Sequence, residues 1–210
     1  LINAGVRDRL GGLHSANIAL VSADLAEIEP LQQSGAWDET GQMLAAAGRQ
    51  ACAAGADFLV LATNTMHKVA AEIEAGAGVP LLHIADAAAE AVQAAGIKRV
   101  GLLGTRFTME QDFYRQRLEA QGLEVLIPNA GGRAAVHRVI YAELVLGVIR
   151  AESRARYRQV IAELVAAGAE AVILGCTEIG LLVGADDSPV PLFDTTRIHA
   201  AAAVDRALRD

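Results

Sequence analysis

Two short stretches of the chain repeat one pattern, in which an apolar run ends in a small polar triplet and then continues into a helical sequence. The first stretch is GADFLVLATNTMHK around Thr63, and the second is GAEAVILGCTEIG around Cys176. When the two are superimposed, Thr63 falls on Cys176, 113 positions later. Each copy is typical of a short buried strand that leads into a helix, which is the building unit of a parallel sheet. The repeat therefore predicts an α/β protein.

The repeat also predicts two pseudo-equivalent halves, each a flavodoxin-like parallel sheet covered by helices. We expect the first half to span 1–97, with the closing helix 195–210 packed back on it, and the second half to span 98–194. Open α/β proteins bind ligands at the carboxyl ends of their strands. The active site is therefore expected in a cleft between the two halves.

Hydrophobic periodicity predicts a strand or a helix for most segments. The expected strands are 17–24, 57–62, 79–86, 99–105, 123–128, 170–175 and 190–193. The expected helices are 1–10, 38–55, 64–75, 86–95, 107–121, about 134–149, 153–167, one from 177 and one from 195. The stretch that contains Pro30, Gln32, Gly35 and Trp37 is expected to be an irregular connection.

The second half opens with a strand and a Gly-Thr turn at 99–105, whose counterpart in the first half would precede residue 1. We therefore expect the first half to lack its opening strand, in a chain that is shortened at its amino terminus. The alternative is that another chain fills this edge of the sheet.

The amino-acid composition argues against several classes of function. Hydrophobic residues make up 53% of the chain but aromatic residues only 4%, which suits thin buried strands and alanine-faced helices. A net charge of −7 argues against nucleic acid as the main partner, because a phosphate-binding surface needs a basic excess. No metal-ligand spacing appears among the histidines, cysteines and acidic residues. No apolar run is long enough to predict a membrane span.

Cysteine usage favours a reducing compartment. The chain has two cysteines, Cys52 and Cys176, which are too few for a disulfide framework. We therefore expect a cytoplasmic protein. Cys52 lies in an alanine-rich helical stretch and is expected to serve packing alone.

A thiol and a hydroxyl thus stand at related positions, each at the predicted start of a helix. The free amides and positive partial charge of a helix start lower the pKa of a thiol and hold an anion such as a carboxylate. The neighbours Asn64, Thr65 and Thr177 supply further hydrogen-bond donors without adding charge. Removing a proton from one face of a carbon and returning it to the other requires two acid/base groups in such an arrangement.

The motifs TNTMHK, LLGTRFTM and VILGCTEIGLLV…PLFDTTRIHA resemble the cofactor-independent aspartate/glutamate racemase family, taken broadly. The resemblance covers essentially the whole chain. It implies an isomerase that acts on an amino acid, with aspartate or glutamate expected, without pyridoxal phosphate or a metal. Members of the family usually place two cysteines on opposite faces of the substrate α-carbon. Cys176 matches the second of these, and Thr63 stands in place of the first, as in one branch of the family.

The resemblance also implies roles for the neighbouring polar residues. Asn64, Thr65 and Thr177 are expected to hold the substrate α-carboxylate, and Glu178 is expected to receive the ammonium group or to tune Cys176. Two further threonines are expected to line the second side of the site, Thr105 and Thr108.

The substrate side chain has no obvious cation to receive it. Relatives specific for acidic substrates carry Arg or Lys nearby, and this chain offers Gln32. His67 and Lys68 either contact the substrate or form an ordinary helical face, and His199 is more typical of a structural residue.

A threonine hydroxyl hardly ionises near neutral pH. The hypothesis is therefore that Cys176 abstracts the α-proton from one enantiomer and that Thr63 is the weaker partner on the opposite face. Such a site would catalyse the two directions of the racemisation reaction unequally.

Two other functions remain open. Arylmalonate-type decarboxylases share the second cysteine and need one proton donor, which Cys176 would supply. A shortened, inactive carboxylate-binding protein is the third possibility. In each case the expected partner is a small carboxylate or amino acid, and many relatives are homodimers.

Overall fold

The computed structural model describes residues 1–209, which divide into two compact units. Unit 1 comprises Leu1–Leu61, Met66–His83 and the end of the chain from Ala200, and unit 2 comprises Ala62–Thr65 and Ile84–His199. The predicted halves, 1–97 with 195–210 and 98–194, stay a prediction, because compactness does not test whether two halves are equivalent.

Unit 2 is built on a parallel sheet of four strands in the order β4-β3-β5-β6. The strands are β3 (Arg99–Gly104), β4 (Glu124–Leu126), β5 (Ala171–Gly175) and β6 (Leu192–Asp194). All of β5 is buried, as is all of β3 except its first residue. Strands that are covered on both faces carry nearly continuous apolar runs, which is why the sequence predicts these two to within one residue at either end.

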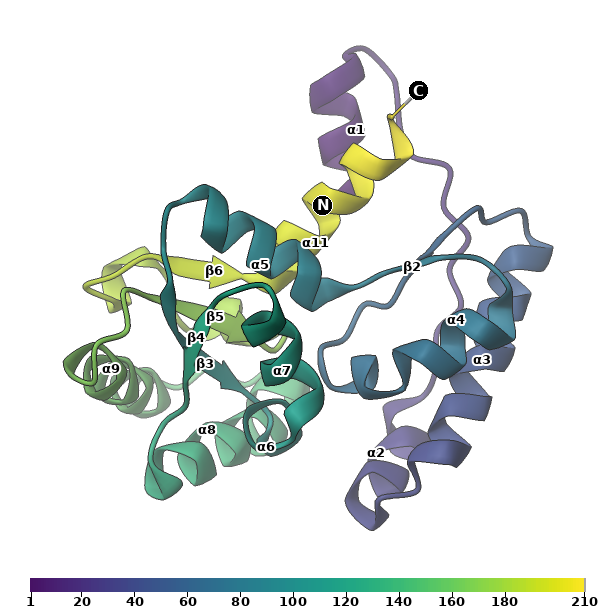
Figure 1. Ribbon diagram of the computed structural model, residues 1–210. Helices are drawn as coiled ribbons and strands as arrows, with labels where there is room; N and C mark the ends of the chain where they lie inside the picture. The colour runs from purple at the N-terminus through teal and green to yellow at the C-terminus, as the bar shows by residue number, and fades with distance from the viewer. Residues whose placement is uncertain (210) are drawn as a thin grey trace. The chain divides into compact units, whose positions relative to one another are not determined.

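Helices cover both faces of this sheet because successive strand side chains point to opposite sides. The helices of unit 2 are α5 (Ile84–Ala94), α6 (Arg106–Glu110), α7 (Asp112–Ala120), α8 (Ala130–Ala142), α9 (Ala151–Ala166), α10 (Ile179–Leu182) and the start of α11 (Thr195–Ala207), with the 3-10 turns η2 (Leu144–Leu146) and η3 (Ala185–Asp187). Leu103 and Leu174 pack into one apolar cluster with α8 and α9. Leu102 and Ile173 pack into another with α5 and α7, so the unit has three layers (Figure 1).

Unit 1 holds a short parallel pair of strands and a group of helices. Its elements are α1 (Ile2–Leu10), α2 (Leu25–Ser34), α3 (Trp37–Ala53), β1 (Leu59–Val60), η1 (Thr65–Val69, whose first residue belongs to unit 2), α4 (Ala70–Ala77), β2 (Leu81–Leu82) and the end of α11. Leu44, Leu59 and Ile73 form the centre of its apolar cluster, to which α2, α3 and α4 contribute. Within residues 1–209, no helix is both long and apolar enough to cross a membrane.

Small residues set the close packing of α3 against α4. A Cβ atom added at Gly76 of α4 would lie 2.6 Å from the Cβ of Ala45 on α3. At Gly48 of α3 an added Cβ would lie 3.0 Å from the Cβ of Ala77. The two helices can therefore pack closely, because glycine and alanine leave little side chain between their backbones.

We expect Gly76→Ala to destabilise the protein by about 1–3 kcal/mol, because the added methyl group overpacks the α3–α4 contact. Chemical denaturation measures the loss. Gly131→Ala is the matched control, since the nearest atom to its added Cβ is 3.5 Å away and alanine favours the helix. Equal stability of the two variants would contradict the packing described here.

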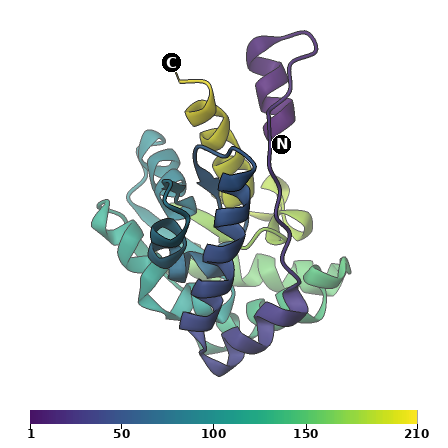
Figure 2. The ribbon, with the colours of Figure 1, turned by 90° about the vertical axis from the view of Figure 1, so that its right-hand side faces the viewer.

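Two predictions for the first half are wrong. Residues 17–24 form neither strand nor helix, and Figure 2 shows the segment as an open coil between α1 and α2. Within the described residues no strand pairs with it, and Ile18 and Leu20 are exposed. The connection expected around Pro30 is instead the helix α2. It begins at the cap Asp24, whose carboxylate accepts the Ala26 amide at 2.9 Å, and ends at Gly35, which adopts a left-handed conformation.

Other boundaries shift for local reasons. The strand expected at 79–86 has two residues, because α5 begins at Ile84, and the helix expected over 64–75 opens as the 3-10 turn η1. The helix expected over 107–121 breaks at Gln111 into α6 and α7. The helix expected from 177 is only the short α10.

Candidate functional site

The adjacent strands β3 and β5 deliver two of the predicted site residues to one edge of the sheet. Their register pairs Gly104 with Gly175, the last residue of each strand, so Thr105 and Cys176 leave the sheet at the same level. The chain goes from β3 to β4 on one side and later returns to β5 on the other. Such a reversal of strand order, at the carboxyl ends, is where open parallel sheets bind ligands.

The two glycines allow the strand ends to approach closely. A Cβ atom added at Gly104 would lie 2.7 Å from the carbonyl oxygen of Gly175, and one added at Gly175 would lie 2.9 Å from that of Leu103. A side chain at either position would push the strands apart. The Gly-Thr and Gly-Cys pairs therefore hold Thr105 and Cys176 as neighbours.

Three buried threonine hydroxyls form a cluster beside this edge. The Oγ1 atoms of Thr65 and Thr105 lie 3.0 Å apart, and those of Thr105 and Thr108 lie 3.2 Å apart. The Thr105 Oγ1 also accepts the Thr108 amide at 3.3 Å and so caps α6. The sequence predicted all three residues for the site, and they are in contact.

Asn64 is held by a chain of hydrogen bonds that ends on β5. Its Nδ2 donates to the Thr195 Oγ1 at 3.1 Å, and Thr195 donates in turn to the Leu174 carbonyl at 2.8 Å. Because the single hydroxyl hydrogen of Thr195 is used in this way, its oxygen must accept, and this fixes which end of the Asn64 amide faces it. The Asn64 Oδ1 is buried and has no hydrogen-bond partner among residues 1–209. It is an acceptor suited to an N–H group of a ligand.

Thr63 directly precedes the anchored residues Asn64 and Thr65 in the chain. It is half-buried in the stretch Ala62–Thr65, which belongs to unit 2 and contains Asn64 and Thr65, both hydrogen-bonded to other residues of that unit. Thr63 therefore belongs to the same compact unit as Cys176.

The buried Cys176 is directed at a carboxylate. Its Sγ donates to the Oε2 of Glu178 at 3.0 Å, and the Thr177 hydroxyl donates to the same oxygen at 2.7 Å. Cys176 is 8% exposed, whereas Thr177 and Glu178 are half-buried.

The expectation that a helix start lowers the pKa of Cys176 is wrong. Burial, the negative charge of Glu178 and the hydrogen bond to Glu178 together raise the pKa of the Cys176 thiol well above its ordinary value. The amides of Thr177 and Glu178 act in the opposite direction but are outweighed. Cys176 is therefore a protonated thiol at neutral pH, and it must lose that proton before it can act as a base.

The remaining predicted residue, Gln32, lies in unit 1. It is buried in α2, and its Nε2 donates to the sulfur of Met66 at 2.9 Å. Lys68 lies in the same unit with its Nζ 4.1 Å from the centre of the Trp37 ring, and partial burial lowers its pKa. Cys52 packs beside the apolar cluster of unit 1.

Sequence reasoning missed Thr195 as a site residue. It is fully buried and links Asn64 to β5. Its position could have indicated a role, because it directly follows β6, which pairs with β5 and ends at the same edge of the sheet. Among the residues that the structure describes, no three His, Cys, Asp or Glu side chains gather in a way that could hold a metal ion.

The comparisons with known proteins agree on one relationship. The model of a family described as Asp/Glu/Hydantoin racemase matches residues 1–203. A crystal structure from Yersinia pestis, provisionally described as an Asp/Glu racemase, is 56% identical, with a TM-score of 0.91 over 99% of this chain and 91% of that one. An aspartate racemase homologue from Pyrococcus horikoshii is 30% identical, with a TM-score of 0.83 over 99% of this chain and 91% of its own.

A curated relative carries the name of an amino-acid racemase. The broad specificity amino-acid racemase RacX of Bacillus subtilis is 27% identical over 154 residues, which are 71% of this chain. The match spans 64% of that relative's length.

Proposed function

Because the chain belongs to the Asp/Glu/Hydantoin racemase family, we propose that it is a cofactor-independent racemase that interconverts the enantiomers of an amino acid, aspartate or glutamate first. The observation that carries this proposal is the single buried thiol of Cys176, hydrogen-bonded to Glu178 at the switch point of the sheet. The names of the relatives support an amino-acid substrate, and those of the two similar crystal structures support an acidic one.

The polar groups around Cys176 suit both ends of an α-amino acid. Thr65 and the second N–H of Asn64 are proposed to hold the α-carboxylate, because they bring donors without charge. Thr177 is proposed to join them by turning its hydroxyl, which donates to Glu178 here, toward the substrate. The ammonium group is assigned to the acceptors of the site, the Glu178 carboxylate and the Asn64 Oδ1. Two residues are proposed to line the second side of the substrate, Thr105 and Thr108, and Gln32 is proposed to contact its side chain.

The proton has a defined path in this proposal. Cys176 first passes its thiol proton to the Glu178 Oε2, 3.0 Å away, and the resulting thiolate takes the α-proton of the substrate. The electron pair of the broken C–H bond stays on the α-carbon and spreads into the carboxylate. Thr63 then supplies a proton to the opposite face, by itself or through a water molecule that it orients. The alkoxide left on Thr63 is a strong base, so this half of the reaction is the slower one. Solvent water then takes the proton from Glu178 and returns one to Thr63, which restores both groups for the next turnover.

A screen of amino acids tests the proposal directly. Each pure enantiomer is incubated with the protein, and chiral chromatography follows the appearance of the other. Conversion of aspartate, glutamate or another amino acid is the expected result. A protein that binds these amino acids but converts none of them would be a carboxylate-binding protein instead.

A second candidate function rests on the protonated state of Cys176. A thiol that keeps its proton at neutral pH is suited to protonate one face of a carbanion, which is all that decarboxylation of an arylmalonate-type acid requires. Release of carbon dioxide from phenylmalonate, without conversion of any amino acid, would favour this function over racemisation.

Replacing Glu178 with glutamine is expected to change two rates in opposite directions, the rate at which Cys176 is alkylated and the rate of racemisation. The carboxylate raises the pKa of Cys176, so its removal lowers that pKa and increases the thiolate fraction at pH 8. Alkylation by iodoacetamide should therefore become faster. Racemisation should become slower, by about tenfold or more, because the proton acceptor has been lost.

The control for this pair of measurements is Glu90→Gln, an exposed position on α5. It should change neither rate. If Glu178→Gln behaves like Glu90→Gln in both measurements, Glu178 neither tunes Cys176 nor accepts its proton.

A further inference from the structure

Asp194 lies at the point where β6 ends and α11 begins. Its backbone pairs with Leu174 of β5, and the next residue is Thr195, which holds Asn64. The side chain of Asp194 is 23% exposed, and the proposed reaction gives it no part. Its place in the chain suits it to control the position of Thr195.

One oxygen of the Asp194 carboxylate caps α11. The Oδ1 accepts the amide of Thr196 at 2.9 Å and the amide of Arg197 at 3.3 Å. These are the second and third residues of the helix, so Asp194 occupies the position at which a side chain satisfies the free amides of a helix start. The cap fixes the first turn of α11, and the first residue of that turn is Thr195.

The other oxygen of this carboxylate lies against α10. A Cβ atom added at Gly180 would lie 2.7 Å from the Asp194 Oδ2, so the carboxylate fits here because residue 180 has no side chain. The Arg197 Nε lies 3.4 Å from the same oxygen, but its side chain is 75% exposed and contributes little. Gly180 comes two positions after Glu178. The contact therefore joins the start of α11 to the segment that carries Cys176 and Glu178.

We propose that Asp194 is a positioning residue for substrate binding, which acts on Asn64 through Thr195 and requires glycine at position 180. This role rests on the proposed function, in which the Asn64 Oδ1 accepts from the substrate ammonium group. Without the cap, the first turn of α11 loosens and the Thr195 hydroxyl no longer holds the Asn64 Nδ2. The amide is then free to turn over, which brings its N–H groups to the place where the ammonium group binds.

The first test is the KM for the two enantiomers of aspartate, or of the amino acid that the screen identifies. Asp194→Ala is expected to raise KM about tenfold or more for both enantiomers, because a hydrogen bond to a charged group is lost. The turnover number should change by less than about threefold, since the ammonium group keeps its charge throughout the reaction. Asp194→Asn should restore most of the affinity, because asparagine caps a helix as well as aspartate does.

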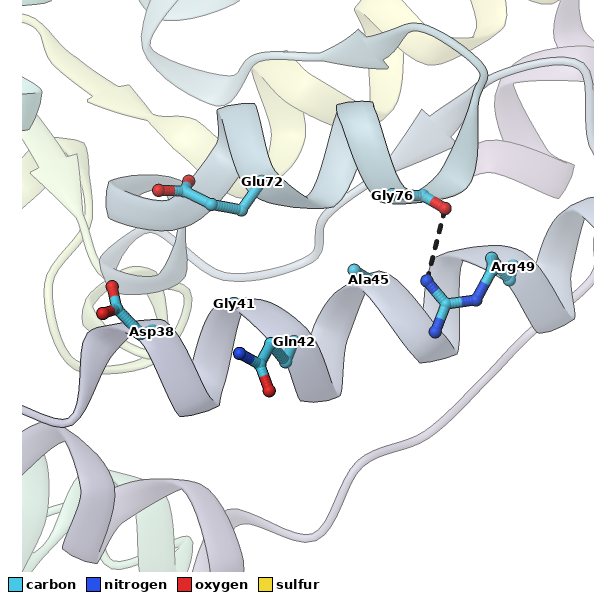
Figure 3. Close-up of a pocket in the computed structure, with 7 residues that line it drawn as sticks. All are labelled: Asp38, Gly41, Gln42, Ala45, Arg49, Glu72 and Gly76. Atoms are coloured by element: carbon cyan, nitrogen blue, oxygen red, sulfur yellow. Dashed lines mark hydrogen bonds between the residues drawn. The ribbon is translucent and has the colours of Figure 1, made fainter.

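Gly180→Ala is expected to raise KM in the same way, because its methyl group displaces the Asp194 carboxylate. Gly184→Ala is the matched control, since an added Cβ at that position meets no atom within 4 Å. It should keep the wild-type KM. Gly76→Ala controls for lost stability, because it overpacks the α3–α4 contact of unit 1 (Figure 3) and should also keep the wild-type KM.

A double-mutant cycle tests whether Asp194 acts through Thr195. Thr195→Val removes the hydroxyl that holds Asn64. If Asp194 acts through that hydroxyl, adding Asp194→Ala to Thr195→Val should raise KM by less than about twofold more. Effects that multiply would overturn the proposal. Circular dichroism confirms that each variant is folded.

A measurement on Asn64 itself does not depend on activity. The side-chain NH₂ signals of Asn64 are followed by nuclear magnetic resonance of the ¹⁵N-labelled protein and are assigned by their loss in Asn64→Asp. Asp194→Ala and Gly180→Ala should shift these signals in the same direction as Thr195→Val, and Gly184→Ala should leave them in place.

The two readouts separate this proposal from the proposed function. Shifted Asn64 signals in a protein that racemises no amino acid would support the link from Asp194 to Asn64 and contradict the racemase function. An active racemase in which Asp194→Ala changes neither the Asn64 signals nor KM would overturn the role of Asp194 alone.

Discussion

Replacing Cys176 with alanine is expected to lower racemisation and α-hydrogen exchange by about 10²–10⁴-fold, the range typical of losing a positioned acid or base. Cys176 is the only thiol in unit 2, where the proposed substrate groups are gathered, and its proton is already shared with Glu178. Exchange is measured in heavy water, from the loss of the α-proton signal in the nuclear magnetic resonance spectrum of the substrate.

Cys52→Ala is the matched control for this prediction. It removes the other thiol of the chain, which packs beside the apolar cluster of unit 1, and it should leave the rate nearly unchanged. A Cys176→Ala protein with full activity would exclude Cys176 as a proton carrier and, with it, the proposed mechanism.

Replacing Thr63 with cysteine is expected to raise the turnover number of the slower direction by about tenfold or more, because a thiol ionises far more readily than a hydroxyl. The two enantiomers have equal free energies, so kcat/KM must be the same in both directions. The asymmetry of the wild-type site must therefore appear as different values of kcat, and of KM, for the two enantiomers. Initial rates at saturating concentrations of each enantiomer measure it.

Thr63→Val provides the comparison, since it keeps the shape of threonine and removes the hydroxyl. It should abolish racemisation, whether Thr63 transfers the proton itself or orients a water molecule. If Thr63→Val keeps wild-type turnover numbers in both directions, Thr63 is a structural residue and another group serves the second face.

The central sheet of unit 2 could be predicted because its strands are buried on both faces. β3 and β5 carry uninterrupted apolar runs, so their positions follow from the sequence to within one residue at either end. The α2 helix could not be predicted from periodicity, since Pro30 in its interior is a helix breaker in most contexts. The signals at its two ends, Asp24 and Gly35, outweigh that proline.

The segment 17–24 shows the limit of a local pattern. Its apolar residues are those of a strand, but a strand is stabilised by hydrogen bonds to a neighbour, which no local pattern supplies. Among the described residues it finds none, and it remains a coil.

Some contacts within the candidate site join residues that the sequence selected, whereas Thr195 and the electrostatics of Cys176 were not predicted. The contacts of Thr65 with Thr105, and of Cys176 with Glu178, join residues that the sequence had selected. The direction of the Cys176 pKa shift was not predictable, because it depends first on the burial of the thiol and then on the Glu178 side chain turning back toward it. Spacing along the chain does not determine such an orientation.

The measurement that tests the account most directly is α-hydrogen exchange in heavy water, followed separately from each pure enantiomer of the substrate. The proposed site has two acid/base groups of unequal strength, with Cys176 on one face of the α-carbon and Thr63 on the other. It therefore predicts that the α-hydrogen exchanges without inversion from one enantiomer only. That enantiomer presents its α-proton to Cys176, whose thiol can return a deuteron to the same face. The other enantiomer should exchange only as it is converted. Equal exchange without inversion from both would contradict the proposed asymmetry of the site.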